Sequence, residues 1–208
     1  MAEQLRYDTG TTGLVLIDLL NEFLADDGKL NARIAEMVRS QDLVSQLGRL
    51  IAGARVAGVP IIYAPHGLDE HSFDDITYLH PSFTRALENK AFWKGTTGAD
   101  FYPPLRPQAG ETVLTQHRMY DSFIGTDLQE QLHAQGIQKI VFAGLTSSAC
   151  IEGTGRHALE AGYHVTFVAD AVADFTQEEH RAAVDLAYPV YGHETVTVDQ
   201  FLAAVGPA

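Results

Sequence analysis

The chain has 208 residues, of which 46% are apolar and 20% charged, and its formal net charge is −13. Such an acidic chain lacks the basic surface that nucleic acids and anionic membranes attract, and its apolar content excludes wholesale disorder. One cysteine can form neither an internal disulfide nor a cysteine-based zinc site.

Short apolar runs alternate with longer amphipathic stretches along the whole chain. The runs are typical of buried strands, and the stretches place apolar residues at helical spacing. In chain order we predict a strand at 13–18, a helix at 41–57, strands at 59–64 and 111–116, a helix at 126–135 capped by Thr126, a strand at 139–144, a helix at 150–161, a strand at 163–169, a helix at 177–186 and a strand at 194–198. Segment 65–107 is expected to be a long excursion over the sheet.

This order of elements predicts one α/β domain over residues 1–208. Nearly continuous apolar strands alternating with helices are typical of a parallel sheet covered on both faces. In such sheets the functional site lies beyond the carboxyl ends of the strands. Here those ends carry Asp18, His66, His117 and the segment 145–150.

Cys150 follows a strand through a turn of small residues and begins a helix. The N–H groups of a helix N-terminus lower the pKa of a thiol and can bind an oxyanion. Asp18 could exchange a proton with this thiol, and His117 would complete an Asp, His and Cys constellation. The alternatives are a buried structural cysteine, a solvated aspartate and a loop histidine with a partner of its own.

Three blocks of sequence carry a resemblance to a known family. They are LVLIDLLNEF around Asp18, HRMYDSFIGTDL from His117, and GLTSSACIEGTGRHALEAGYHVTFVADA around Cys150. In this order they resemble the isochorismatase-like cysteine hydrolases, which include isochorismatases, nicotinamidases, N-carbamoylsarcosine amidases, and biuret and ureidoacrylate hydrolases. The resemblance implies a three-layer, Rossmann-like fold with a six-stranded parallel sheet, an Asp, Lys and Cys triad, a cis peptide before the cysteine and an oxyanion hole.

The resemblance assigns roles to particular residues. Asp18 corresponds to the family aspartate and Cys150 to the nucleophile. The backbone N–H groups of Ala149 and Cys150 correspond to the oxyanion hole, and the Thr146–Ser147 bond to the cis peptide.

The family lysine has no counterpart in this chain. An ungapped alignment puts His117 in its place, whereas a shift by one residue puts Gln116 there. We prefer His117, because a partly protonated imidazole can stabilise a thiolate. Its acidic neighbours are expected to favour the cation, since strand ends leave the site only partly dry.

The remaining candidates concern substrate and metal. We expect Phe23, His66, Trp93 and Tyr120 to contact the substrate, and the aromatic residues of the excursion either line a pocket or pack on the sheet. Nicotinamidases of the family hold a divalent metal through an Asp-x-His pair and a later histidine. Asp69, His71 and His80 supply these residue types at a different spacing, which favours a solvated loop, so no metal or cofactor is expected.

The sequence therefore predicts a hydrolase that cleaves a C–N bond of a small amide, ureide or carbamoyl substrate through a cysteine thioester. One alternative is vinyl-ether hydrolysis by acid catalysis, as in isochorismatases, and another is a non-catalytic ligand-binding module. No apolar run reaches the ~18 residues of a membrane helix, and residues 1–8 do not resemble a secretory signal. We expect a cytoplasmic homo-oligomer, a dimer or tetramer, with no nucleic-acid or membrane partner.

Overall fold

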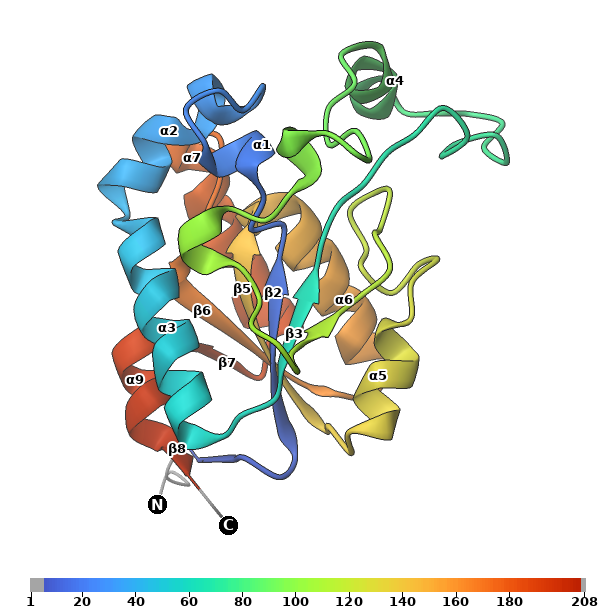
Figure 1. Ribbon diagram of the computed structural model, residues 1–208. Coiled ribbons are helices and arrows are strands. Elements are labelled where there is room, and N and C mark those ends of the chain that lie inside the picture. Colours follow the sequence, from blue (N-terminus) through green and yellow to red (C-terminus); the bar gives the residue numbers. More distant parts are fainter. Residues whose placement is uncertain (1–5, 207–208) are drawn as a thin grey trace.

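In the computed structural model, which describes residues 6–206, six parallel strands form a sheet in the order β4-β3-β2-β5-β6-β7 (Figure 1). The strands are β2 (Thr12–Ile17), β3 (Ile61–Ala64), β4 (Thr112–Val113), β5 (Lys139–Leu145), β6 (His164–Ala173) and β7 (Glu194–Val196). A second, two-stranded parallel sheet pairs β1 (Tyr7–Asp8) with β8 (Val205–Gly206) at the end away from the strands' carboxyl ends. The predicted six-stranded parallel sheet is confirmed.

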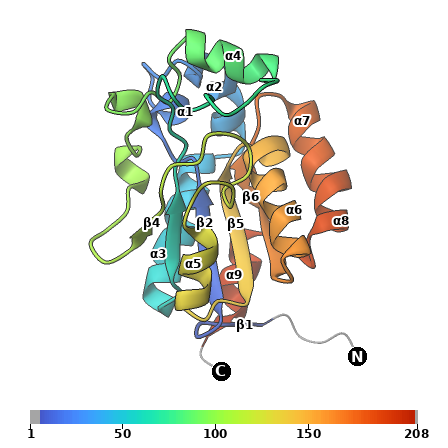
Figure 2. The same ribbon diagram turned by 90° about the vertical axis from the view of Figure 1, so that its right-hand side faces the viewer.

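Side-chain alternation along the strands builds one core on each face of the sheet. Leu14 and Leu16 pack into the core beneath α2, α3 and α9, whereas Val15 and Ile17 pack into the core beneath α5 and α6. Figures 1 and 2 show these two helical layers with the sheet between them. The helices of the two layers are α2 (Asn31–Ser40), α3 (Leu43–Ala57), α5 (Leu128–Ala134), α6 (Glu152–Glu160), α7 (Gln177–Arg181), α8 (Tyr188–Tyr191) and α9 (Val198–Ala204). Within residues 6–206, no helix is both long and apolar enough to cross a membrane.

The predicted elements differ from the structure mainly at their ends. The predicted strand at 111–116 is only two residues long, and helix α5 begins after Asp127 rather than Thr126, although the Thr126 hydroxyl still accepts from the Leu128 N–H at 3.2 Å. The sequence analysis missed both α2 and α9, and α9 begins with a capping box between Thr197 and Gln200. The predicted helix at 177–186 continues through a π-helical turn (Ala182–Ala187) into α8.

The predicted excursion crosses the carboxyl end of the sheet. It contains α4 (Pro81–Glu88) and short 3-10 turns at Thr97–Ala99 and Pro103–Leu105, and the four-residue α1 (Asn21–Leu24) lies nearby. We call residues 68–94 the cap. Leu68, Phe73 and Phe83 form a third apolar cluster within it, whereas Ala91 and Phe92 belong to the core beneath α2, α3 and α9. In both views α4 lies beyond the carboxyl ends of the strands.

Candidate active site

Asp18 follows β2 directly and is fully buried. Its backbone is left-handed, with a φ of 57°, a conformation that aspartate tolerates better than most residues. The adjacent strand β5 passes close to this point at Gly144, which has a φ of 122°. A Cβ on Gly144 would lie 2.1 Å from the Ile17 carbonyl oxygen, so a glycine is required where β5 passes the end of β2.

His117 lies just beyond β4 and faces Asp18. Its Nε2 is 2.9 Å from Asp18 Oδ1, and its Nδ1 is 2.7 Å from the carbonyl oxygen of Met119. A carbonyl and an ionised carboxylate can only accept hydrogen bonds, so both ring nitrogens donate. These contacts favour an imidazolium paired with a carboxylate, and both side chains are shielded from solvent.

The pKa of His117 follows from two opposing effects. Burial lowers it, because a dry site disfavours the cation. The charge of Asp18, its hydrogen bond and the Met119 carbonyl outweigh burial, so the pKa of His117 is raised above its ordinary 6.5. The effect of these neighbouring groups on the pKa of His117 exceeds that of burial, as expected. The expectation of a partly dry site is wrong, because Asp18 is 0% exposed and His117 1%.

Cys150 lies in a π-helical turn (Ser147–Ile151) between β5 and α6. Such turns are rare and often occur at functional sites. The thiol is buried, and burial together with the negative charge of Asp18 raises its pKa well above the ordinary value of 9.0. The expected lowering of this pKa by the helix N-terminus is therefore wrong, since desolvation and a neighbouring carboxylate both oppose the thiolate. Cys150 is a neutral thiol at rest.

The second carboxylate oxygen of Asp18 stands out. Oδ2 is buried, yet it has no hydrogen-bond partner within residues 6–206. Buried polar atoms almost always have a partner, so an exception calls for a reason. Asp18 and Cys150 line the same cavity, where Oδ2 is a free acceptor and the thiol a free proton donor.

The turn before Cys150 is held by Asp174, which the sequence analysis did not single out. Its carboxylate Oδ2 accepts from the Ser147 hydroxyl at 3.0 Å and from the Ser148 N–H at 2.6 Å. Asp174 follows β6 directly, so its place at a strand end was the signal that could have found it. The Ala149 N–H, a predicted oxyanion donor, is 3.2 Å from the Thr146 carbonyl oxygen to which it donates.

The cis peptide bond joins Leu145 and Thr146 rather than Thr146 and Ser147. The predicted position is therefore wrong by one residue. It was transferred by counting along a motif, and neither bond precedes a proline, so no residue-level preference distinguishes the two.

A cavity of about 910 Å³ opens above Asp18 and Cys150. Three of the four predicted substrate contacts line it, namely Phe23, His66 and Tyr120. The fourth, Trp93, does not line this cavity and packs against the cap cluster.

Gln116, the alternative to His117 for the position of the family lysine, lies outside the cavity lining. The side chain of Gln116 covers Gly67, where an added Cβ would lie 2.3 Å from it, and it is absent from the cavity lining. Of the two residues weighed for the lysine position, only His117 contacts Asp18.

Comparison with known proteins shows to which family this chain belongs. A model described as the isochorismatase domain matches residues 12–200. The chain belongs to the isochorismatase family. Ureidoacrylate amidohydrolase RutB of Variovorax paradoxus (strain S110) is 27% identical over 222 residues, covering 99% of this chain and 86% of that protein. N-carbamoylsarcosine amidase from Thermoplasma acidophilum, at 27% identity, aligns with a TM-score of 0.70 over 91% of this chain and 97% of its own.

The fold is likewise that of an isochorismatase-like hydrolase. A cysteine hydrolase from Pseudomonas syringae pv. phaseolicola 1448A aligns with a TM-score of 0.80 at 21% identity, covering 98% of this chain and 100% of that one. The chain is thus an isochorismatase-like hydrolase whose strand ends bring Asp18, His117 and Cys150 to the base of one cavity or directly beside it.

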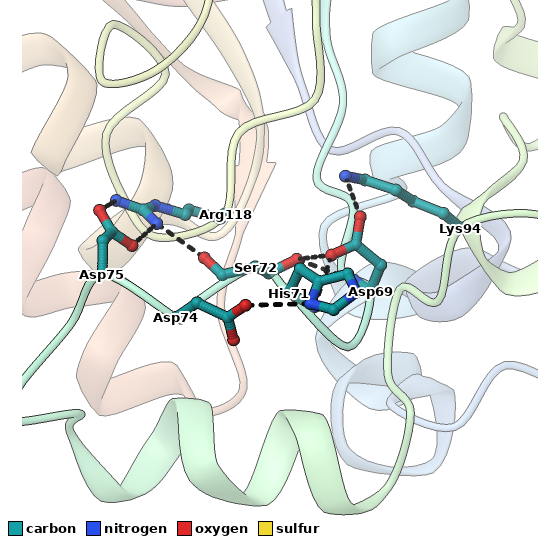
Figure 3. A network of polar contacts seen from close by, with 7 residues as sticks. All are labelled: Asp69, His71, Ser72, Asp74, Asp75, Lys94 and Arg118. Carbon is teal, nitrogen blue, oxygen red and sulfur yellow. Dashed lines mark hydrogen bonds and ion pairs between the residues drawn. The ribbon is translucent and has the colours of Figure 1, made fainter.

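Asp69, His71 and His80, which the sequence analysis considered as metal ligands in this isochorismatase-family chain, contact other residues of the cap. Asp69 Oδ2 accepts from Lys94 Nζ at 2.7 Å, and His71 Nδ1 is 2.9 Å from Asp74 Oδ2, as Figure 3 shows. His80 instead caps α4, accepting from the Ser82 N–H. Within residues 6–206, no group of three His, Cys, Asp or Glu side chains is arranged to hold a metal ion.

A bidentate ion pair anchors the same loop to the segment that carries His117. Arg118 pairs with both carboxylate oxygens of Asp75 and donates to the Ser72 carbonyl (Figure 3). Bidentate pairs of this kind fix geometry as well as adding energy. The loop is thereby joined to the residue that follows His117.

His66 is also a buried histidine, but its pKa is shifted in the opposite direction to that of His117. It stacks on Phe92 with ring centroids 4.4 Å apart, and its Nδ1 has no partner within the described residues. Burial, helped by the nearby positive charge of His117, lowers the pKa of His66 from 6.5 to about 3. His66 is therefore a neutral wall of the cavity at physiological pH.

The lowered pKa of His66 predicts a loss of stability in acid. Below 6.5 the unfolded chain binds a proton at this residue that the native protein does not bind until about pH 3, so stability falls with pH across that interval. Between about pH 7 and about pH 5 the wild type should lose about 2 kcal/mol more than His66→Gln. Urea denaturation of both proteins at the two pH values measures this difference. Parallel losses in the two proteins would contradict it.

Proposed function

We propose that this hydrolase cleaves a C–N bond of a small amide or ureide through a thioester on Cys150. The observation that carries the proposal is the pairing of a neutral buried thiol with the unpartnered Oδ2 of Asp18 in one cavity. The names of two relatives at 27% identity, an amidohydrolase and an amidase, agree with this bond type.

The first half of the reaction transfers the acyl group to sulfur. Cys150 Sγ attacks the carbonyl carbon, and its proton moves to Asp18 Oδ2. Because the thiol is protonated at rest, proton transfer accompanies attack rather than preceding it. Asp18 then donates this proton to the departing nitrogen, the C–N bond breaks, and ammonia or an amine leaves.

The second half regenerates the enzyme. Water gives a proton to Asp18 and adds to the thioester carbonyl, and the C–S bond breaks as sulfur takes the proton back. An amide thus yields a carboxylic acid. With a ureide the group on sulfur is a thiocarbamate in place of the thioester, and its hydrolysis yields a carbamic acid, which decomposes to carbon dioxide and an amine.

His117 supplies the positive charge of the site. Its two N–H groups are held by the Met119 carbonyl and by Asp18 Oδ1, which leaves Oδ2 for the thiol proton. We assign His117 the role of the family lysine on this contact. Unlike a lysine ammonium, an imidazolium loses its charge within the range in which enzymes operate.

The developing oxyanion needs hydrogen-bond donors near Cys150. The N–H groups of Ala149 and Cys150 are assigned this role. The Ala149 N–H donates to the neutral Thr146 carbonyl at 3.2 Å, the long end of the normal range, and a charged oxyanion would compete well for it. Phe23, His66 and Tyr120 would contact the rest of the substrate from the cavity wall.

A screen of ammonia or amine release over amides, ureides and carbamoyl compounds tests this function. We expect turnover of at least one ureide or amide that Cys150→Ala does not catalyse. Turnover of a vinyl ether alone would favour the isochorismatase-type reaction, and no turnover of any class would favour a ligand-binding module.

Substitution of His117 tests its assigned role. His117→Ala should lower kcat/KM about 10²-fold, within the range of acid–base groups, while His117→Lys retains more activity because it restores a cation. Since the pKa of His117 is raised above 6.5, wild-type activity should decline as pH rises through that raised value. His117→Lys should move this decline to higher pH, and pH profiles of kcat/KM measure the shift.

Gln116→Ala is the matched control for this series, because Gln116 is the adjacent residue and does not line the cavity. It should change kcat/KM less than about twofold, since it removes no contact to Asp18. A large loss of kcat/KM in Gln116→Ala, with almost no loss in His117→Ala, would show that the role of the family lysine is assigned to the wrong residue.

A further inference from the structure

One buried histidine has no part in the reaction as described so far. His180 belongs to α7, is 6% exposed and does not line the cavity. Helix α7 and the π-helical segment that follows it both contact the turn that carries Cys150, and Figure 2 shows the α7–α8 segment beside α6. We call this turn, Ser147–Ile151, the Cys150 turn. His180 therefore reaches the turn from a side that the substrate does not occupy.

The ring of His180 contacts the first residue of the Cys150 turn. Its Nδ1 is 3.3 Å from Ser147 Oγ, and the Ser147 hydroxyl donates to Asp174 Oδ2 at 3.0 Å. A hydroxyl has a single proton, so towards His180 the Ser147 oxygen accepts and Nδ1–H donates. Burial lowers the pKa of His180 below its ordinary 6.5, although the charge of Asp174 opposes this shift. A neutral imidazole has one N–H, and the contact with Ser147 places it on Nδ1.

His180 is one of three side chains that hold Ser147. The Asp174 carboxylate accepts from the Ser147 hydroxyl, and the Tyr188 hydroxyl donates to the Ser147 carbonyl oxygen at 3.1 Å. Tyr188 is fully buried and stacks on Phe167 of β6, with ring centroids 4.0 Å apart. Ser147 is itself 0% exposed, so bulk water cannot replace a partner that is lost there.

The groups that the proposed reaction uses lie within three residues of Ser147. The N–H groups of Ala149 and Cys150 are the assigned oxyanion donors, and the Cys150 thiol is the nucleophile. Donors of this kind stabilise an oxyanion because they are in place before the charge develops, and a displacement of about 1 Å can cost about 10²-fold in rate. All of them belong to one short helical turn, so a shift of Ser147 moves them together.

We propose that His180 is a positioning residue of the reaction, which holds the Cys150 turn through the hydrogen bond from its Nδ1–H to Ser147. The proposal rests on the proposed function and adds a residue to its site. Because His180 lies outside the cavity lining, it contributes nothing to binding of the substrate in its ground state. Its loss should therefore lower kcat and leave KM nearly unchanged.

Three substitutions of His180 distinguish a hydrogen-bond donor from a packing residue. The side-chain nitrogen of asparagine is bonded to Cγ, as Nδ1 is in histidine, so His180→Asn can keep the donor to Ser147. His180→Gln places its nitrogen one bond farther from the backbone, and His180→Leu has no donor. Turnover is measured with the amide or ureide that the wild type hydrolyses best.

His180→Leu and His180→Gln should each lower kcat about 10- to 100-fold and change KM less than about threefold. His180→Asn should keep kcat within about fivefold of the wild type. If His180→Leu does not fold, the comparison of His180→Asn with His180→Gln decides, because both side chains are polar amides that differ in the place of the donor.

His164→Leu is the matched control, because it removes a partly buried histidine from the other end of the sheet. His164 is the first residue of β6 and stacks on His193. Its replacement should change kcat and KM less than about twofold. A loss carried mainly by KM, or equal kcat in His180→Asn and His180→Gln, would overturn the positioning role while the hydrolase function stands.

Alkylation of Cys150 gives a second readout that needs no turnover. The thiol of the wild type is slow to react because burial and Asp18 raise its pKa. Release of the turn in His180→Leu should expose the thiol and speed its reaction with iodoacetamide at least about threefold near pH 8, and His180→Asn should restore the slow rate.

If the wild type hydrolyses no amide or ureide, this alkylation pattern separates the two proposals. Faster alkylation in His180→Leu and a slow rate in His180→Asn would support the hold of His180 on the Cys150 turn and count against the proposed reaction. In that case, equal alkylation rates in the wild type and all three variants would overturn the role of His180 as well.

Discussion

Cys150→Ala should abolish hydrolysis while the protein stays folded. Removing the nucleophile of a covalent mechanism costs on the order of 10⁴- to 10⁶-fold in kcat. The thiol occupies a buried position at the edge of a core, so loss of one sulfur atom should cost only about 1 kcal/mol of stability. Turnover assays and thermal unfolding of both proteins measure the two effects. Acid quenching of the wild type during turnover should show the acyl group on the peptide that contains Cys150.

Full activity of Cys150→Ala would mean that sulfur is not the nucleophile and that Asp18 acts alone as an acid, as in vinyl-ether hydrolysis. Alkylation by iodoacetamide is a weaker criterion. The raised pKa of Cys150 makes the resting thiol slow to react whether or not the protein is catalytic, because the thiolate is the reactive form. A slow thiol is therefore compatible with a working enzyme.

Asp18→Asn should lower activity and raise thiol reactivity at once. The amide cannot accept the thiol proton, so kcat/KM should fall at least about 10³-fold. The charge of Asp18 is also one cause of the raised pKa of Cys150, so its removal lowers that pKa and increases the thiolate fraction at a given pH. Alkylation by iodoacetamide near pH 8 should therefore be faster in Asp18→Asn than in the wild type. Asparagine also tolerates the left-handed backbone at this position, so the fold should persist.

The control is Asp199→Asn, which removes an exposed carboxylate paired with Arg49 and far from Cys150 in the fold. It should change neither turnover nor alkylation. Slower alkylation of Asp18→Asn than of the wild type would mean that Asp18 activates the resting thiol, which is the reverse of the electrostatics described above.

The sheet and the convergence of the candidate catalytic residues could be predicted from sequence because both depend on local pattern. The four inner strands β3, β2, β5 and β6 are mostly apolar runs, and a parallel sheet brings the residues that follow its strands to one edge. This rule predicts that Asp18, His117 and Cys150 lie close together at that edge. The pKa of Cys150 does not, because it depends on how completely the chain buries the thiol and on the distance to a carboxylate from another strand.

The cap shows why other site residues could not be predicted. Phe92 and Trp93 are adjacent aromatic residues in a segment without helical or strand periodicity. The backbone is left-handed at Phe92, with a φ of 51°, and this local turn puts Phe92 against His66 in the cavity and Trp93 into the cap cluster. Nothing in the pattern of residues distinguishes the two.

The third apolar cluster gives the cap a stability of its own. Leu68, Phe73 and Phe83 form a small cluster apart from the two main cores, and only Ala91 and Phe92, near the end of the cap, join one of those cores. Small units of this kind open on their own, at a lower free energy than global unfolding. Substrate entry and product departure can thus proceed by partial opening of the cap, while the sheet keeps Asp18 and His117 in register. In enzymes whose lids open in this way, opening or product release often limits the turnover number in place of the bond-breaking step.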